Sequence, residues 1–78
     1  MNKKITIYTT PTCAYCKMTK EFLRENNIKY DEKDVAADTA AREEMVAKSH
    51  QLGVPVVDIE GEIIVGFDKD KLSELLGL

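Results

Sequence analysis

A chain of 78 residues is long enough for one small domain, so we expect residues 1–78 to form a single domain. Its 11 basic and 14 acidic residues give a net charge of −3, which argues against nucleic acid as the main partner. No segment approaches the roughly 18 consecutive apolar residues of a membrane helix, and residues 1–8 lack the continuous apolar run of a signal peptide. We therefore expect a cytoplasmic monomer with no membrane partner.

The first half of the chain predicts a strand, a helix and a second strand. Residues 5–8 open a strand that we expect to be buried on both faces, and Pro11 ends it because proline cannot donate to a strand ladder. Thr12 is a suitable N-cap for a helix over residues 13–26. Residues 28–34 form a second strand, and their polarity predicts a position at the edge of the sheet.

The second half of the chain predicts a helix, a hairpin and a final helix. Asp38 or Thr39 is expected to cap the helix, and Glu60-Gly61 is a two-residue turn between two apolar runs, as in a β-hairpin. In chain order, we expect a helix over residues 40–51, strands over 56–59 and 62–65, and a helix over 69–76. The order β-α-β-α-β-β-α predicts a small α/β domain of three layers, whose first two strands pair in parallel.

Two cysteines, Cys13 and Cys16, lie at the predicted junction of the first strand and first helix. A disulfide that closes such a short loop contributes only about 2 kcal/mol, so the pair is a poor structural link and reactivity explains it better. Residues i and i+3 of a helix are close enough to form a disulfide after a small adjustment. Unpaired backbone N–H groups and the helix dipole favour a thiolate at the helix N-terminus. We predict that Cys13 is the attacking, solvent-facing thiol and that Cys16 is the more buried resolving thiol.

Other interpretations of these residues remain open. A zinc site needs about four ligands, whereas this chain offers two cysteines and His50, so a zinc or iron–sulfur site would have to be shared between two subunits. We favour redox chemistry with no bound metal or cofactor. His50 is expected to be a solvated residue near a helix end, and Lys17 a surface lysine that could add a favourable charge near the thiols.

At this point the sequence resembles the glutaredoxin family and its glutaredoxin-like redoxin relatives. The resemblance extends over essentially the whole chain and is carried by the segments Ile5-Thr6-Ile7-Tyr8-Thr9, Cys13-Ala14-Tyr15-Cys16, Val54-Pro55 and Gly66-Phe67-Asp68. It implies a thioredoxin-like fold, with a four-stranded mixed sheet flanked by three helices. It also implies an enzyme, a dithiol thiol–disulfide oxidoreductase that reduces protein or small-molecule disulfides and takes part in electron transport.

The resemblance assigns roles to residues around the cysteines. Val54-Pro55 is similar to the family's cis-proline turn, whose residue before proline offers backbone groups to a bound disulfide partner. Tyr15 resembles the tyrosine that flanks the thiols, and Gly66, Phe67 and Asp68 correspond to a substrate-binding segment. The implied reductants are glutathione, which would act as a co-substrate, and thioredoxin reductase.

Some positions depart from the pattern of glutathione-using members. Thr10 stands where those members commonly have a lysine, and residues 65–69 contain one glycine where a Gly-Gly-x-Asp-Asp segment is common. Gly66-Phe67 is closer to redoxins that donate electrons to ribonucleotide reductase and are recycled by thioredoxin reductase. A dedicated electron donor of that kind is the alternative within the same class. We expect Phe67 to pack on the core.

Overall fold

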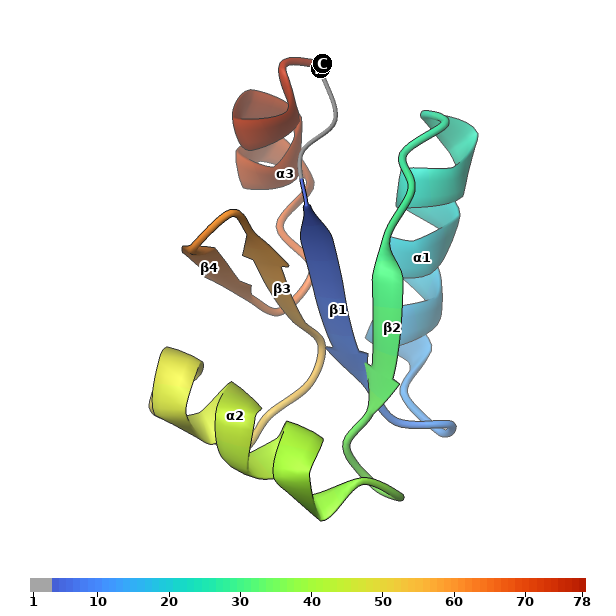
Figure 1. The fold of residues 1–78 in the computed structure, drawn as a ribbon. Coiled ribbons are helices and arrows are strands. Elements are labelled where there is room, and N and C mark those ends of the chain that lie inside the picture. The colour runs from blue at the N-terminus through green and yellow to red at the C-terminus, as the bar shows by residue number, and fades with distance from the viewer. Residues whose placement is uncertain (1–3) are drawn as a thin grey trace.

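The computed structural model describes residues 4–78; residues 1–3, which the single-domain prediction also covers, lie outside the described part (Figure 1). Seven elements follow one another in the predicted order. In chain order they are β1 (Ile5–Thr9), α1 (Ala14–Glu25), β2 (Asp31–Asp34), α2 (Thr39–Ser49), β3 (Val56–Ile59), β4 (Glu62–Val65) and α3 (Lys69–Leu76). Within the described residues, none of these helices is long and apolar enough to cross a membrane.

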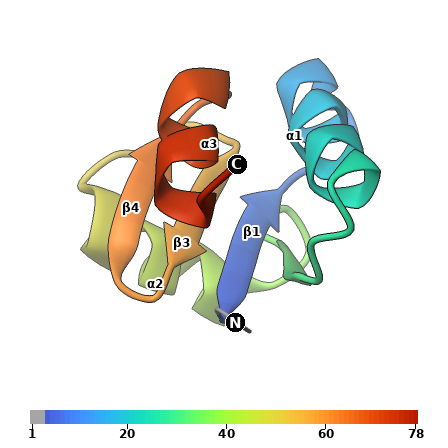
Figure 2. The ribbon, with the colours of Figure 1, turned by 90° about the horizontal axis from the view of Figure 1, so that it is seen from above.

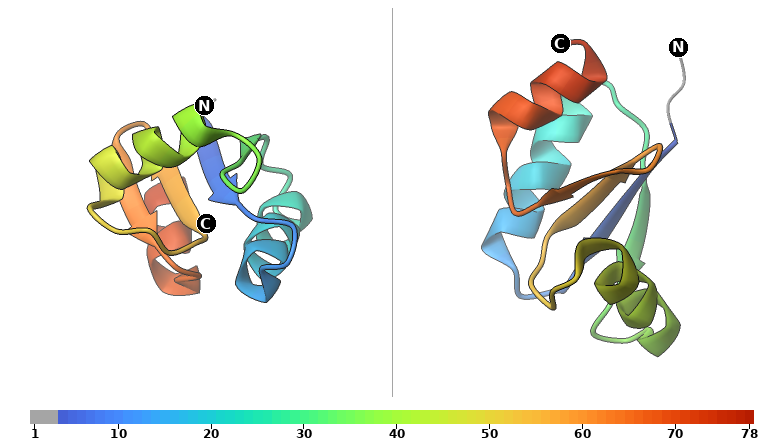
Figure 3. Two further views of the ribbon diagram at one scale, coloured as in Figure 1. Left: turned by 90° about the horizontal axis from the view of Figure 1, so that it is seen from below. Right: turned by 90° about the vertical axis from the view of Figure 1, so that its left-hand side faces the viewer.

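The four strands form one mixed sheet in the order β2-β1-β3-β4. Strand β1 pairs in parallel with β2 and antiparallel with β3, and β3 pairs antiparallel with β4. Helices α1 and α3 cover one face of the sheet and α2 covers the other, as the views from above and below show (Figures 2 and 3). The three-layer α/β architecture and the edge position of β2 are therefore confirmed.

The central strand β1 is buried along its whole length, as expected, and contributes to two cores. Successive side chains of a strand point to opposite faces of the sheet. Ile5 and Ile7 accordingly pack with Leu23 of α1 in the core beneath α1 and α3. Tyr8 packs with Met45 of α2 in the core on the opposite face. The same strand leads directly into the cysteine segment, so both cores fix where that segment begins.

The limits of two elements differ from the prediction for local reasons. Helix α1 begins at Ala14, and its N-cap is Cys13 instead of Thr12, because the Cys13 sulfur accepts the N–H of Cys16. Strand β2 begins at Asp31 and not at residue 28. The Ile28 N–H donates to the Leu23 carbonyl in the last turn of α1 (2.8 Å), so it is not available to pair with β1.

Helix α2 also ends earlier than predicted. It covers Thr39–Ser49 with Asp38 as its N-cap, and His50 adopts a left-handed conformation and donates its N–H to Val46 (2.8 Å). The hairpin that follows matches its prediction: Glu60 and Gly61 both have positive φ, which a two-residue hairpin turn of this twist requires.

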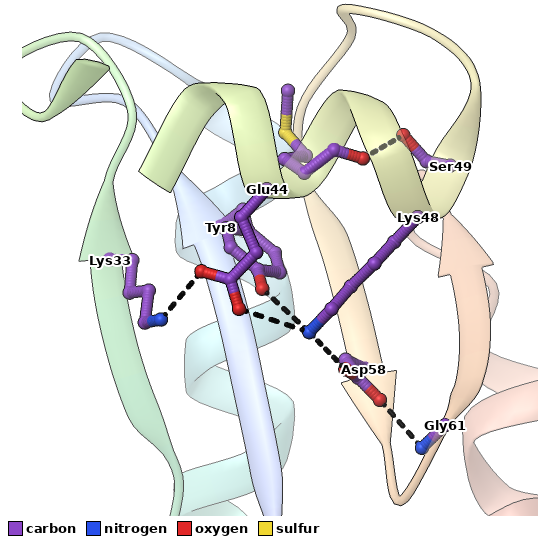
Figure 4. Close-up of polar contacts among 8 residues, drawn as sticks. Tyr8, Lys33, Glu44, Lys48, Ser49, Asp58 and Gly61 are labelled. Carbon is purple, nitrogen blue, oxygen red and sulfur yellow. Dashed lines mark hydrogen bonds and ion pairs between the residues drawn. The ribbon is translucent and has the colours of Figure 1, made fainter. Parts of the chain in front are cut away.

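A polar network connects α2 to the strands beneath it (Figure 4). The Lys48 ammonium donates to the Tyr8 hydroxyl (3.0 Å) and pairs with Asp58 (2.6 Å) and Glu44 (3.2 Å). Glu44 also pairs with Lys33 of β2 at 2.8 Å. Lys33 faces α2 because it is opposite Tyr8 in the parallel register of β1 and β2. The network holds the second half of α2 against three strands, and the sequence analysis did not predict it.

Candidate active site

Cys13 lies at the point where the chain leaves the sheet and enters α1. Its N–H donates to the Thr10 carbonyl (3.4 Å), which closes the turn after β1. Its half-buried sulfur accepts the N–H of Cys16 at 3.1 Å. That N–H belongs to the first turn of the helix, where backbone donors have no partner within the helix. Because N–H donors and the helix dipole stabilise negative charge, this position suits a thiolate.

Cys16 lies one turn further along α1 and is completely buried. Burial and the hydrogen bond with Cys13 raise the pKa of the Cys16 thiol to about 12, although a hydrogen bond from the Thr10 backbone lowers it. Cys16 is therefore a neutral thiol at physiological pH. Both cysteines are free, and the half-buried one carries the hydrogen bond that favours charge. Cys13 is thus the more accessible of the two sulfurs, as an attacking thiol requires, and Cys16 lies enclosed behind it, as a resolving thiol requires.

The Val54-Pro55 segment, about 40 residues later in the chain, lies next to Cys13. The peptide bond between Val54 and Pro55 is cis, and the Val54 carbonyl is 3.8 Å from the Cys13 sulfur, which donates to it. Pro55 is fully buried, and its carbonyl accepts the N–H of Gly66 at 2.8 Å. The structure thus brings together Cys13, Cys16 and the predicted Val54-Pro55 turn, and connects Gly66 to that turn.

The other predicted site residues lie in different surroundings. Tyr15 is 62% exposed in the first turn of α1, next to the thiols. Phe67 packs on the core against Phe22, with ring centroids 6.2 Å apart in an edge-to-face arrangement, as expected. The Asp68 carboxylate caps α3 by accepting the N–H of Lys71 at 3.1 Å. Phe67 and Asp68 therefore each make an internal contact that explains the residue without a ligand.

Two residues considered for the chemistry lie at the surface. His50 is exposed at the C-terminal end of α2, and Lys17 is exposed on α1. Within residues 4–78, no group of three or more histidine, cysteine, aspartate or glutamate side chains is placed to hold a metal ion.

A cavity of about 270 Å³ borders the thiol segment, and the sequence analysis missed it. Thr10 and Val54 lie on its side nearest Cys13, while Leu52, with 61% of its surface exposed, and Arg42 lie further away. Its remaining walls are Val35, Ala36 and Met45. The cavity is lined mostly by apolar side chains, together with Thr10 and one cationic side chain.

A second set of polar residues near the thiols was also missed. Lys20 of α1 pairs with Glu32 of β2 at 3.1 Å, and the buried Thr9 hydroxyl donates to the same carboxylate oxygen at 3.0 Å. The sequence held one signal for it: Lys20 is four residues after Cys16, so the two side chains share a helix face.

These features define a class of protein. A Cys-x-x-Cys pair at a strand–helix junction, opposite a cis-proline turn on a mixed four-stranded sheet with three helices, is typical of thioredoxin-like redox proteins. The sequence model of the glutaredoxin family matches residues 5–64. The chain therefore belongs to the glutaredoxin family.

Individual relatives agree with this assignment. A glutaredoxin-like protein of Clostridium pasteurianum, from its rubredoxin operon, is 51% identical over 72 residues, which are 92% of this chain and 96% of the relative. The crystal structure of the thioredoxin-like protein BC3987 superposes with a TM-score of 0.88 at 43% identity, covering 92% and 99% of the two chains. The glutaredoxin-like NrdH-redoxin of Escherichia coli has a TM-score of 0.83 at 28% identity, covering 92% and 93%.

Proposed function

We propose that this protein is a dithiol oxidoreductase that reduces disulfides of proteins or small molecules through Cys13 and Cys16. The observation that carries the proposal is the arrangement of the two sulfurs: a half-buried sulfur that accepts a helix N–H, with a buried neutral thiol one turn behind it. Membership of the glutaredoxin family supports the same activity. The reaction needs no bound cofactor or metal, because the two thiols supply both electrons.

In the proposed mechanism, the Cys13 thiolate attacks one sulfur of a substrate disulfide. A bond forms between the two sulfurs, and the other substrate sulfur leaves as a thiolate and takes up a proton. Cys16 then loses its proton and attacks the Cys13 sulfur. The Cys13–Cys16 disulfide forms, the bond to the remaining substrate sulfur breaks, and that sulfur leaves as a thiolate. Two electrons have then moved from the protein to the substrate.

The substrate is proposed to bind across the segments that surround Cys13. The Val54 carbonyl already accepts the Cys13 thiol, so backbone groups at the cis-proline turn are available to a chain bonded to that sulfur. Tyr15 offers an exposed ring beside the thiols. We propose Gly66, Phe67 and Asp68 as more distant contributors, through the hydrogen bond of Gly66 to Pro55.

The test of this function uses matched cysteine variants in a disulfide-reduction assay. Cys13→Ser is expected to abolish reduction, because the attacking sulfur is lost. Cys16→Ser is expected to accumulate a mixed disulfide at Cys13, visible by mass spectrometry, because the resolving sulfur is lost. Wild-type activity in Cys13→Ser would show that this sulfur is not the nucleophile, and the assignment would be abandoned.

A dedicated electron donor recycled by thioredoxin reductase is the second candidate. The similarity to the glutaredoxin-like NrdH-redoxin, whose structure is described as explaining a thioredoxin-like activity profile, favours it. Turnover should be compared with thioredoxin reductase and NADPH, and with glutathione and glutathione reductase. Faster recycling by thioredoxin reductase supports the donor, and faster recycling by glutathione supports a glutathione-dependent enzyme. In either case we propose a cytoplasmic monomer. A dimer linked by zinc or an iron–sulfur cluster would be recognised by its mass and by metal analysis, and an iron–sulfur cluster also by its visible absorbance.

A further inference from the structure

Cys16 is buried, yet the proposed exchange requires it to lose a proton. Its side chain is fully buried on α1, and apolar surroundings disfavour the charged form of a thiol. Only the ionised form attacks a disulfide, so the resolving step depends on that thiolate. A group that favours negative charge at Cys16 therefore raises the rate of this step at neutral pH and extends it to lower pH.

Lys20 is such a group. It lies four residues after Cys16, and side chains of a helix lean toward its N-terminus, so the Lys20 chain extends over the turn that contains Cys16. Only 25% of its side chain is exposed. Burial raises the pKa of the Cys16 thiol, and the positive charge of Lys20 acts in the opposite direction.

A carboxylate on the sheet, that of Glu32, holds the Lys20 ammonium in place. The ammonium pairs with Glu32 at 3.1 Å, and the Thr9 hydroxyl donates to the same oxygen of Glu32 at 3.0 Å. Thr9 is 2% exposed. Glu32 is opposite Ile7 in the register of β1 and β2, so strand alternation directs it toward α1. The ammonium is thus held between helix and sheet, and Glu32 partly neutralises it.

Other charged groups surround the Lys20–Glu32 pair and Cys16. A cavity of about 240 Å³ between α1 and β2 is lined by Lys17, Lys20, Glu21, Arg24, Tyr30 and Glu32. Cys13 faces Cys16 from the start of the helix, and its negative form opposes ionisation of Cys16. Once Cys13 is bonded to a substrate sulfur, that opposition is removed. The Lys20 ammonium, partly neutralised by Glu32, then remains as the positive charge near the Cys16 sulfur.

We propose that Lys20 is a positioning residue for the resolving step, holding a positive charge near Cys16 that favours its thiolate, and that Glu32 limits this effect. The inference rests on the proposed function. In the step concerned, Cys16 gives its proton to solvent and attacks the Cys13 sulfur. The disulfide between the two cysteines forms, and the substrate sulfur leaves with the electron pair of the broken bond.

The two steps of exchange can be measured separately with a chromogenic disulfide, dithiobis-nitrobenzoate. Attack by Cys13 releases a first coloured thiolate, and resolution by Cys16 releases a second. Rapid mixing of the reduced full-length protein over a range of pH gives a pH–rate profile for each phase. Cys13→Ser should lack the fast first phase, and Cys16→Ser should lack the second.

Two variants that break the same ion pair make the test specific. Lys20→Met is expected to move the second-phase profile to higher pH and to slow that phase about three- to tenfold at neutral pH, because an attractive charge is lost. Glu32→Gln is expected to move the profile to lower pH, because Lys20 is no longer neutralised. Lys20→Arg keeps the charge and should keep the wild-type profile.

If the ion pair has only a structural role, the pH–rate profiles of the second phase should shift in the same direction in Lys20→Met and Glu32→Gln. Shifts in the same direction, or two unshifted second phases, would overturn the role of Lys20 while leaving the proposed function intact. Absence of the fast first phase from the wild-type protein would instead overturn the proposed function. A Lys20→Arg profile that matches Lys20→Met also contradicts the inference, since the charge alone should suffice.

Discussion

The polar network beneath α2 is expected to contribute a measurable part of the free energy of unfolding, and Lys48→Met tests it. Methionine retains the aliphatic part of the side chain and removes only the ammonium. Asp58, whose side chain is 14% exposed, then loses its cation, and the buried Tyr8 hydroxyl loses the hydrogen bond from Lys48. Helix α2 would be attached to the sheet mainly through its apolar contacts.

The magnitude follows from how exposed the pair is. Removing one partner of a buried ion pair costs roughly 3–5 kcal/mol, whereas an exposed pair is worth about 0–1 kcal/mol. The Lys48–Asp58 pair is intermediate, with side chains 33% and 14% exposed, so we expect a loss of about 2 kcal/mol. Urea unfolding of so small a domain has a slope near 1 kcal/mol per molar, so the midpoint should fall by about 2 M.

The matched control is Lys33→Met. It removes the same charge and also breaks an ion pair with Glu44, but both of its side chains are more exposed, at 39% and 38%. A clearly smaller fall in the urea midpoint is expected for Lys33→Met. If Lys48→Met keeps the wild-type midpoint, or if the two variants lose the same amount, the reasoning from burial is refuted.

The remaining predictions concern acid stability and a backbone position. The hydrogen bond from Lys33, aided by Lys48 against the opposing effect of burial, lowers the pKa of Glu44 from 4.5 to about 2. The stabilisation that ionised Glu44 provides is present above pH 4.5 and lost as pH falls toward 2. Glu44→Gln should therefore lose folded protein less steeply between pH 4.5 and 2 than the wild type, as measured by circular dichroism. An equally steep curve would exclude Glu44 as a source of acid sensitivity. Gly66→Ala should lower the free energy of unfolding by about 1–2 kcal/mol because φ is +80°. No atom lies within 4 Å of the added carbon, so an unchanged thermal midpoint would mean that the backbone relaxes freely.

Most elements of the fold could be predicted because their signals are local. Alternating apolar residues indicate β1, the Glu60-Gly61 pair indicates the hairpin, and Asp38 lies where a cap is needed. Errors arose where a different local contact replaced the expected one. Thr12 is the better capping residue by type, yet the Cys13 sulfur accepts the helix N–H. Ile28 is a good strand residue, yet its N–H completes the end of α1.

The candidate site divides in the same way. The Cys-x-x-Cys spacing and its place before a helix are properties of neighbouring residues, so the sequence indicates them directly. The contact between Cys13 and Val54 joins residues 41 positions apart, and only the antiparallel pairing of β1 with β3 brings those segments together. The family resemblance implied that the Val54-Pro55 turn serves a disulfide partner bound at the thiols, but the strand pairing that places the turn there comes from the structure.

The sequence alone determined the order of the elements, the position of the two thiols at a helix start and the alternation of β2. It places Glu32 and Lys33 on opposite faces of an edge strand, because strand side chains alternate. It could not say which helix lies over each face. The three-layer packing decided that Glu32 pairs with Lys20 near the buried thiol, while Lys33 pairs with Glu44 beneath α2. A side chain's partner depends on which segments distant in the chain are packed against it, and that is settled only when the whole sheet is covered.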